Sequence, residues 1–364
     1  MKIESIDKKY FKKLKATSKI ALIADTHLSI ERKDNNFLVH MDTMFAEFKK
    51  LCIEQKVDLI VIAGDLFHSK SIVNTHALVN VNNILQDLSA VCPIIIIPGN
   101  HDLPYADKPE INLASIYKHF DTITVIEYPS NFVLGDTEFL FVPYHNNITA
   151  MLNDIKKDLD FTKQINLFSH FGTTDFKVSE TSNQYVDDEA AEVSALTLKK
   201  FNKVFLGHYH GYQTKKNITY VSAPLQSRHG DELSKHGFVI FDLASNTHKF
   251  FENKATPRFI TYELNKTNAM EMLKLENHYI RINVKKHIAK EIIVGLRQQL
   301  MKKNPEVKII FDFKDSLMKL PELKGWNEII FNSSETLLTN FLTQLEAQGT
   351  LPFDKDSLIK HLEL

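Results

Sequence analysis

Acidic, amide and imidazole side chains follow short apolar runs at five places in the sequence. These places are Asp25 with His27, Gly64-Asp65, Gly99-Asn100-His101-Asp102, His170, and Gly207-His208-Tyr209-His210. Carboxylates and imidazoles suit borderline divalent cations, and one carboxylate can bridge two of them. Two ions about 3.5 to 4 Å apart can clamp a phosphate and activate a water for in-line attack. Any one motif alone could be a capping acid beside a surface histidine, but the five together predict a two-metal hydrolytic site.

Small and aromatic residues within these motifs affect how the polar side chains are presented. Gly64, Gly99 and Gly207 fit sharp turns that let the next side chain face the site, although each could be an ordinary turn residue. Tyr209 separates two histidines. If this segment is extended, His208 and His210 point the same way and Tyr209 points elsewhere.

The apolar runs before the motifs are typical of buried strands in an α/β domain. They cover residues 20–24, 59–63, 94–97, 138–142, 165–169 and 204–206. Apolar residues at helical spacing separate the first three runs, at 37–51 and 74–88. An open α/β sheet places its ligands beyond the carboxyl ends of the strands, which is where these motifs stand. Further strands at 218–221 and 237–243 complete the domain, which we expect to close near Pro257.

A second pattern begins after Pro257. A strand at 279–284, helical spacing at 288–300 and a strand at 307–313 predict a small strand-helix-strand unit. Two amphipathic stretches separated by a Gly-Thr-Leu-Pro break then predict a helix-loop-helix over 333–362. We therefore expect three parts, with the boundaries 1–257, 258–318 and 319–364.

Composition excludes little. Lys and Arg total 44 against 45 Asp and Glu, so global basicity gives no argument for nucleic acid, although a local basic face remains compatible with it. The lysine-rich first nineteen residues lack the apolar run of a secretory signal. No stretch approaches the roughly 20 apolar residues of a membrane span. We expect a cytoplasmic protein with no membrane partner.

The five motifs, in this order and spacing, resemble those of the calcineurin-like metallophosphoesterases. Within that superfamily, Gly64-Asp65-Leu66-Phe67-His68 and the small unit that follows the first domain are similar to the SbcD-type DNA nucleases and their bacteriophage counterparts. The resemblance covers residues 19 to 313. It departs from the family in the eighteen residues before the first strand and in Ser29, which stands where a glycine often follows.

The resemblance implies a four-layer α-β-β-α sandwich with a small α/β cap domain and a C-terminal helix-loop-helix. It also implies two divalent ions, Mn²⁺ with Mg²⁺ as the alternative. One ion would be held by Asp25, His27, Asp65 and His210. The other would be held by Asp65, Asn100, His170 and His208. Asp65 is then the bridging ligand.

Three further residues receive roles from the resemblance. His101 would stabilise the transition state or protonate the leaving oxygen. His68 would help to position the phosphate, although a solvent-exposed histidine at a helix start is the alternative. Asp102 either orients His101 or caps the next turn.

The resemblance further implies partners. They are DNA (double-stranded ends, single-stranded or hairpin DNA), an SbcC-type ATPase bound by the C-terminal helix-loop-helix, and a second copy of the nuclease paired through helices of its first domain. Simple packing of the helix-loop-helix against the cap is the alternative for that segment. The implied location is the cytoplasm of a bacterial cell or of a phage-infected host.

Three hypotheses of function remain. The first is a manganese-dependent DNA nuclease subunit, exonuclease and endonuclease, that works with an ATPase in DNA end processing. The second is a generic calcineurin-like phosphodiesterase or phosphatase acting on a small or protein substrate, which has no need of a cap and a terminal helix pair. The third is a metal-bearing scaffold without turnover, which has no use for His101.

Overall fold

The computed structural model describes residues 3–7, 14–28, 36–178, 192–264, 269–284 and 290–311. The chain divides into two compact units, Met1–Thr256 and Pro257–Leu364, and each is described by itself. Ser29 and the helix-loop-helix predicted within 319–364 lie outside the described residues.

The first sheet of the N-terminal unit has six strands in the order β13-β12-β2-β3-β4-β5. They are β2 (Lys19–Ile23), β3 (Leu59–Ala63), β4 (Ile94–Ile97), β5 (Ile123–Val125), β12 (Gly237–Asp242) and β13 (Thr247–Glu252). Strands β2 to β5 are parallel, with Ile23 opposite Ile62 and Ala63 opposite Ile97. The carboxyl ends of β2, β3 and β4 therefore meet at one edge of the sheet.

The second sheet has seven strands in the order β1-β6-β7-β8-β9-β11-β10. They are β1 (Glu4–Ser5), β6 (Ser130–Leu134), β7 (Thr137–Val142), β8 (Gln164–His170), β9 (Lys203–Gly207), β10 (Gln213–Lys215) and β11 (Ile218–Tyr220). Strands β7, β8, β9 and β11 are parallel, and His170 lies opposite Gly207. Two polar motifs thus end neighbouring strands of this sheet.

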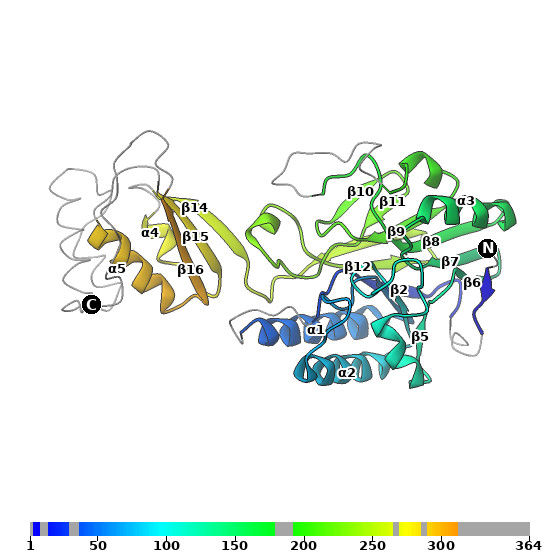
Figure 1. The fold of residues 1–364 in the computed structure, drawn as a ribbon, viewed down its shortest axis with the longest axis horizontal. Coiled ribbons are helices and arrows are strands. Elements are labelled where there is room, and N and C mark those ends of the chain that lie inside the picture. Colours follow the sequence, from blue (N-terminus) through cyan, green and yellow to red (C-terminus); the bar gives the residue numbers. More distant parts are fainter. Residues whose placement is uncertain are drawn as a thin grey trace. The chain divides into compact units, whose positions relative to one another are not determined.

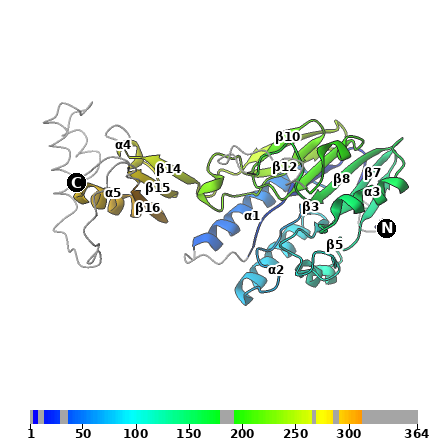
Figure 2. The same ribbon diagram turned by 45° about the horizontal axis from the view of Figure 1, so that its top comes forward.

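The two sheets pack face to face between helices. In β2, Ile20 and Leu22 join the apolar core between the sheets, whereas Ala21 and Ile23 join the core under α1 (Asn36–Gln55) and α2 (Thr75–Ser89). This alternation follows from the two-residue period of a strand buried on both faces. The other face of the second sheet packs against α3 (Ile148–Asp158). Figures 1 and 2 show α1 and α2 on one side of this unit and α3 on the other. The predicted four-layer α-β-β-α sandwich is confirmed.

Local signals explain where the helices begin and which face they bury. The side chain of Asn74 caps α2 by accepting a hydrogen bond from the backbone amide of Ala77 at 2.7 Å. Val81 and Leu85, one helical turn apart, are buried against the first sheet. Short 3₁₀ helices at Leu113–His119, Ala195–Leu198 and His229–Asp231 occur within the connecting segments.

The C-terminal unit is a three-stranded parallel sheet with a helix packed on it. Its strands are β14 (Phe259–Glu263), β15 (Tyr279–Val284) and β16 (Glu306–Phe311), and its helices are α4 (Ala269–Met272) and α5 (Lys290–Met301). The sequence indicated only β15, α5 and β16. β14 was missed because it carries a single buried side chain, Phe259, and so lacks an apolar run. The unit has its own apolar core around Ile280 and Ile293.

Candidate metal centre

The polar motifs of the two sheets meet at the carboxyl ends of their strands. His170 comes from β8, while Asp65 and Asn100 follow β3 and β4. The Nε2 atom of His170 lies 3.3 Å from Oδ2 of Asp65 and 3.0 Å from Oδ1 of Asn100. Nδ1 of His208 lies 3.1 Å from the same Asn100 oxygen. These four side chains were predicted to share one ion, and the fold brings them together.

A second group surrounds the other face of the same aspartate. Nε2 of His27 lies 3.2 Å from Nε2 of His210 and 3.7 Å from Oδ2 of Asp65. Donor atoms of Asp25, His27 and His210 lie within 4.8 Å of one another, and those of Asp25, Asp65 and His170 do so as well. One oxygen of Asp65 therefore lies between the two groups, as a bridging ligand requires.

Several of these residues adopt the left-handed backbone region that side chains usually avoid. The φ angles are 52° at Asp25, 44° at His27, 52° at Asp65 and 98° at His208. Such conformations are costly and persist where surrounding bonds fix them. Here the backbone amides of Asp25 and His27 donate to the carbonyl oxygens of Gly64 and Asp65, each at 3.0 Å. These hydrogen bonds join the loop after β2 to the loop after β3 and hold both loops in their strained conformations.

The conformation of His208 corrects one expectation. Residues 208–210 form a bend rather than an extended segment, so the two histidines do not share a direction through strand alternation. Tyr209 belongs to the core, although its ring centroid lies 5.3 Å from that of His208. Its ring is buried in the core and stacks on Tyr220, with the ring centroids 4.6 Å apart.

The glycines of the motifs are required by close packing. A Cβ atom on Gly64, whose φ is +91°, would lie 2.1 Å from Nδ1 of His170. A Cβ on Gly207 would lie 2.2 Å from the carbonyl oxygen of Ala63 and 2.6 Å from the same His170 nitrogen. All three distances are far below van der Waals contact. Glycine at these turns therefore lets two strands approach the buried ring of His170.

His101 and His68 stand on the outer side of the cluster. Their rings stack with the centroids 5.5 Å apart, and His68 is exposed while His101 is half-buried. The His101 ring also lies edge-on to His27 at 4.9 Å. Its Nδ1 is 2.7 Å from the carbonyl oxygen of His68. The position of both rings beside the cluster, in reach of solvent, is compatible with contact to a substrate.

The side chain of Asp102 holds two loops together. Its carboxylate accepts backbone hydrogen bonds from Gly99 at 2.8 Å, Phe67 at 2.9 Å and Leu66 at 3.2 Å. The side chain is fully buried. Asp102 therefore fixes the turn that precedes it, not the next turn as one alternative held, and joins that turn to the loop after β3. Nothing in the residue pattern indicated the second connection.

Burial controls the charges of the histidines. Burial lowers the pKa of His27 and of His208 to about 3 and that of His210 to about 4, so all three rings are neutral at pH 7. Burial also raises the pKa of Asp25 to about 7. For His170 burial opposes the charge, but the carboxylate of Asp65 prevails and raises its pKa to about 10.

The donor set fits divalent cations. Two neutral imidazole nitrogens facing each other at 3.2 Å can share at most one hydrogen, and the carboxylate beside them is negative. A cation would give both nitrogens a partner. The mixture of carboxylate, amide and imidazole donors suits Mn²⁺, Fe²⁺ or Zn²⁺ better than a purely oxygen-binding ion.

A family model described as calcineurin-like phosphoesterase matches residues 18–212. The chain belongs to this family. Calcineurin-like phosphoesterases hydrolyse phosphate esters at a dimetal centre, and the match contains every candidate ligand named above. No helix of the described residues is long and apolar enough to cross a membrane.

Curated relatives of this calcineurin-like phosphoesterase come from viruses, bacteria and archaea. The chain is 27% identical to a putative phosphoesterase, 244L, of Invertebrate iridescent virus 6 over 54% of its length and 70% of the relative's. It is 22% identical to the SbcD component of the nuclease SbcCD of Staphylococcus epidermidis, over 63% and 67%. It is 21% identical to exonuclease subunit 1 of Enterobacteria phage T4, over 82% and 84%. It is also 22% identical to the uncharacterized protein R555 of Acanthamoeba polyphaga mimivirus, but that match covers only 18% of the viral protein.

Two residues near the cluster were missed by sequence reasoning. The ring of Tyr144 lies edge-on to His170, with the centroids 6.5 Å apart. Its hydroxyl donates to Oε1 of Glu192 at 2.9 Å, and the other oxygen of Glu192 accepts from the amide of Gly172 at 2.8 Å. Tyr144 follows β7 as the other motifs follow their strands, but a tyrosine is not a typical metal ligand and gave no signal.

Proposed function

We propose that this chain is a DNA nuclease subunit that hydrolyses phosphodiester bonds at a two-ion site, with Mn²⁺ as the natural ion and Mg²⁺ as the alternative. The observation that carries the proposal is the position of His101. Its amide donates to Oδ1 of Asp65 at 2.8 Å, and its ring lies against His27. A ring beside the cluster and in reach of solvent can take part in turnover.

The ligand roles follow the two groups around Asp65. Asp25, His27, Asp65 and His210 would hold one ion, and Asp65, Asn100, His170 and His208 the other. When bound, two ions neutralise phosphate charge and lower the pKa of a water. The protein contributes neutral imidazoles, because burial keeps protons off His27, His208 and His210.

The hydrogen bond to His68 determines which nitrogen of His101 can exchange a proton. A carbonyl oxygen only accepts, so the 2.7 Å contact requires the hydrogen on Nδ1 of His101. Nε2 is then the atom that gains or gives a proton. As an imidazolium, His101 can give that proton to the leaving oxygen, and His68 both fixes the ring and stands beside the phosphate.

DNA as the substrate is supported by the relatives. The match to the phage exonuclease subunit extends over 82% of the chain, well beyond the phosphoesterase region, and a second relative is named as part of a nuclease. We extend the proposal to an SbcC-type ATPase partner, bound through residues 319–364, and to a location in the cytoplasm of a bacterial cell or an infected host. The proposed substrates include duplex ends, single strands and hairpins.

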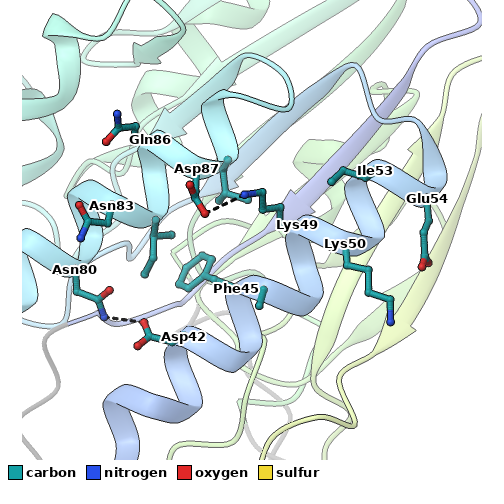
Figure 3. A pocket seen from close by; sticks show the side chains of 13 residues that line it. Asp42, Phe45, Lys49, Lys50, Ile53, Glu54, Asn80, Asn83, Gln86 and Asp87 are labelled. Carbon is teal, nitrogen blue, oxygen red and sulfur yellow. Dashed lines mark hydrogen bonds and ion pairs between the residues drawn. The ribbon is translucent and has the colours of Figure 1, made fainter.

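A second copy of the chain is a further proposed partner. A groove of about 870 Å³ lies along α1 and α2, and none of the candidate site residues lines it. Figure 3 shows Lys49 paired with Asp87 and Asn80 paired with Asp42 across this groove. Apolar side chains of the same two helices are exposed, namely Val39, Ile53, Leu78 and Val79. An exposed mixed surface on two neighbouring helices supports pairing through this face.

The alternative function is a phosphodiesterase or phosphatase with a small or protein substrate. The 27% identity to a viral phosphoesterase without a stated substrate favours it. The test is cleavage of end-labelled linear duplex and hairpin DNA with Mn²⁺, compared with turnover of bis(p-nitrophenyl) phosphate. Cleavage of DNA that is lost in His101→Ala supports the nuclease. Turnover of the small ester alone, with the ATPase partner also supplied, would favour the alternative.

A further inference from the structure

The segment that joins β11 to β12 lies against the end of the metal cluster. The backbone amide of Ala223 donates to the carbonyl oxygen of His210 at 3.0 Å. The amide of Tyr212 donates to the carbonyl oxygen of Lys235, also at 3.0 Å. Both ends of this segment, which we name the 222–236 loop, are therefore bonded to the stretch that carries the candidate ligand His210.

Inside the 222–236 loop, a buried carboxylate fixes one arginine. Asp231 is 4% exposed and accepts hydrogen bonds from the amide and hydroxyl of Ser227 at 2.9 and 3.0 Å. It also accepts from the amide of Arg228 at 3.2 Å and from Nε of Arg228 at 3.4 Å. A buried acid with this many donors remains ionised and rigid. Asp231 therefore anchors Arg228 at two atoms, the backbone nitrogen and Nε.

The outer part of the Arg228 side chain faces solvent. The side chain is 64% exposed, and within the described part of the chain its only side-chain partner is Asp231, through Nε. The terminal nitrogens make no hydrogen bond or ion pair with another described residue. The fold thus holds the guanidinium at Nε and leaves its outer edge exposed, on a loop that is bonded to the backbone of the candidate ligand His210.

We propose that Arg228 binds a phosphate of the polynucleotide substrate adjacent to the scissile bond, on the His210 side of the centre. The planar guanidinium matches two phosphate oxygens at once, which a lysine ammonium does not. A phosphate beside the scissile one exists in a polynucleotide and is absent from a small ester. This inference rests on the proposed function, because it names the part of the DNA that the site contacts in addition to the reacting group.

A merely structural role is the competing explanation. The hydrogen bonds between Arg228 and Asp231 also cap the short 3₁₀ turn His229–Asp231, and an arginine could be present for that purpose alone. The capping role uses the backbone amide and Nε only. It predicts no dependence of DNA affinity on the terminal nitrogens, so measurements on DNA separate the two explanations.

The experiment compares the full-length wild type with Arg228→Ala and Arg228→Lys, and uses Lys235→Ala as the control. Lys235 is an exposed cation on the same 222–236 loop, and its structural contact uses the backbone only. Three quantities are measured: the affinity for a labelled oligonucleotide against salt concentration, kcat and KM for its cleavage with Mn²⁺, and kcat/KM for bis(p-nitrophenyl) phosphate. Metal content and thermal unfolding show whether each variant is folded and loaded.

The proposal predicts that Arg228→Ala lowers the ratio of kcat/KM for DNA to that for the small ester by roughly ten- to a hundredfold, mainly through KM, the scale of a lost charged hydrogen bond. The slope of log affinity against log salt becomes shallower by about 0.7 to 0.9, one phosphate contact. Arg228→Lys restores the slope but only part of the ratio. Lys235→Ala changes neither.

Two results would overturn the proposal in distinguishable ways. Wild-type DNA cleavage with an unchanged ratio and slope in Arg228→Ala, or an equal effect of Lys235→Ala, removes the role of Arg228 and leaves the nuclease function intact. A wild type that hydrolyses the small ester but neither binds nor cleaves DNA removes the proposed function itself, and this inference with it.

Discussion

The backbone amide of His101 donates a hydrogen bond to Oδ1 of Asp65 at 2.8 Å. The other oxygen of that carboxylate faces the candidate ligands His27 and His170, at 3.7 and 3.3 Å. One aspartate thus bonds the backbone of the loop that carries His101 and lies beside both halves of the cluster. Changes at Asp65 and at His101 should consequently have separable effects.

Replacing Asp65 with Asn should remove the metals and preserve the fold. The amide oxygen can still accept from His101, but the negative charge that both ions share is lost. We expect metal content to fall from about two ions per chain to below about half an ion, as measured by elemental analysis. Asp58→Asn is the control, because Asp58 stands at the opposite end of β3 and bonds the Lys19 amide. Two ions retained by the Asp65 variant would exclude a bridge.

Replacing His101 with Ala should leave the metals in place and slow turnover. In the described part of the chain the side chain of His101 bonds a carbonyl oxygen, while its contact with Asp65 uses the backbone. We expect a fall in kcat of about 10²-fold or more, the scale of a lost general acid or charge stabiliser. His119→Ala is the matched control, since His119 is exposed and its Nδ1 contacts the carbonyl oxygen of Ile116. A variant that loses its metals would show that His101 is a ligand instead.

Metal affinity should rise with pH. Burial raises the pKa of Asp25 to about 7, and the Asp65 carboxylate, against the opposing effect of burial, raises that of His170 to about 10. At pH 7 Asp25 is about half protonated and His170 is protonated, and both must be deprotonated to bind a cation. We expect affinity to fall about tenfold per pH unit per proton as pH drops from about 8 to 6. Calorimetric titration in buffers of different ionisation enthalpy counts these protons; a constant affinity over that range would contradict the assignment.

Replacing Gly64 with Ala should destabilise the first unit more than the same change at Gly135. Both glycines have positive φ, which costs alanine about 1 to 2 kcal/mol. At Gly64 the new methyl also collides with His170, whereas at Gly135 it meets nothing within 4 Å. Overpacking adds about 1 to 3 kcal/mol, so urea unfolding should separate the two variants by that amount. Equal losses would mean that the ring of His170 can move aside.

The strands that carry the motifs were predictable because their signal is local. β2, β3 and β4 are buried on both faces, so each is a continuous apolar run that ends where a polar ligand begins. β6 and β14 were missed because partly exposed strands lack such a run. The first described unit ends at Thr256, where a change in apolar pattern is visible in the sequence.

The details of the site depend on contacts between distant residues and were not predictable. Asp102 reaches backbone amides 35 and 36 positions away, and only the folded loops bring them together. The bend at His208 reflects its hydrogen bond from the backbone to the carboxylate of Asp25, 183 positions earlier. Asp231 and Arg228 lie three positions apart in the sequence, but the role proposed for Arg228 depends on the hydrogen bond between the 222–236 loop and His210. Residue type indicates candidates, whereas position relative to other segments decides their roles.

The candidate ligands come from both sheets of the sandwich. Asp65 and Asn100 follow strands of the six-stranded sheet, while His170 belongs to the seven-stranded one. Apolar side chains fill most of the contact between the sheets, and a few hydrogen bonds cross it at this edge, such as the one from the His208 amide to Asp25. Ions chelated at this edge would act as inorganic cross-links between two layers that the chain itself joins only by loops. Loss of the ions would then lower the stability of the fold as well as its activity. The apoprotein would open first at the interface between its two sheets.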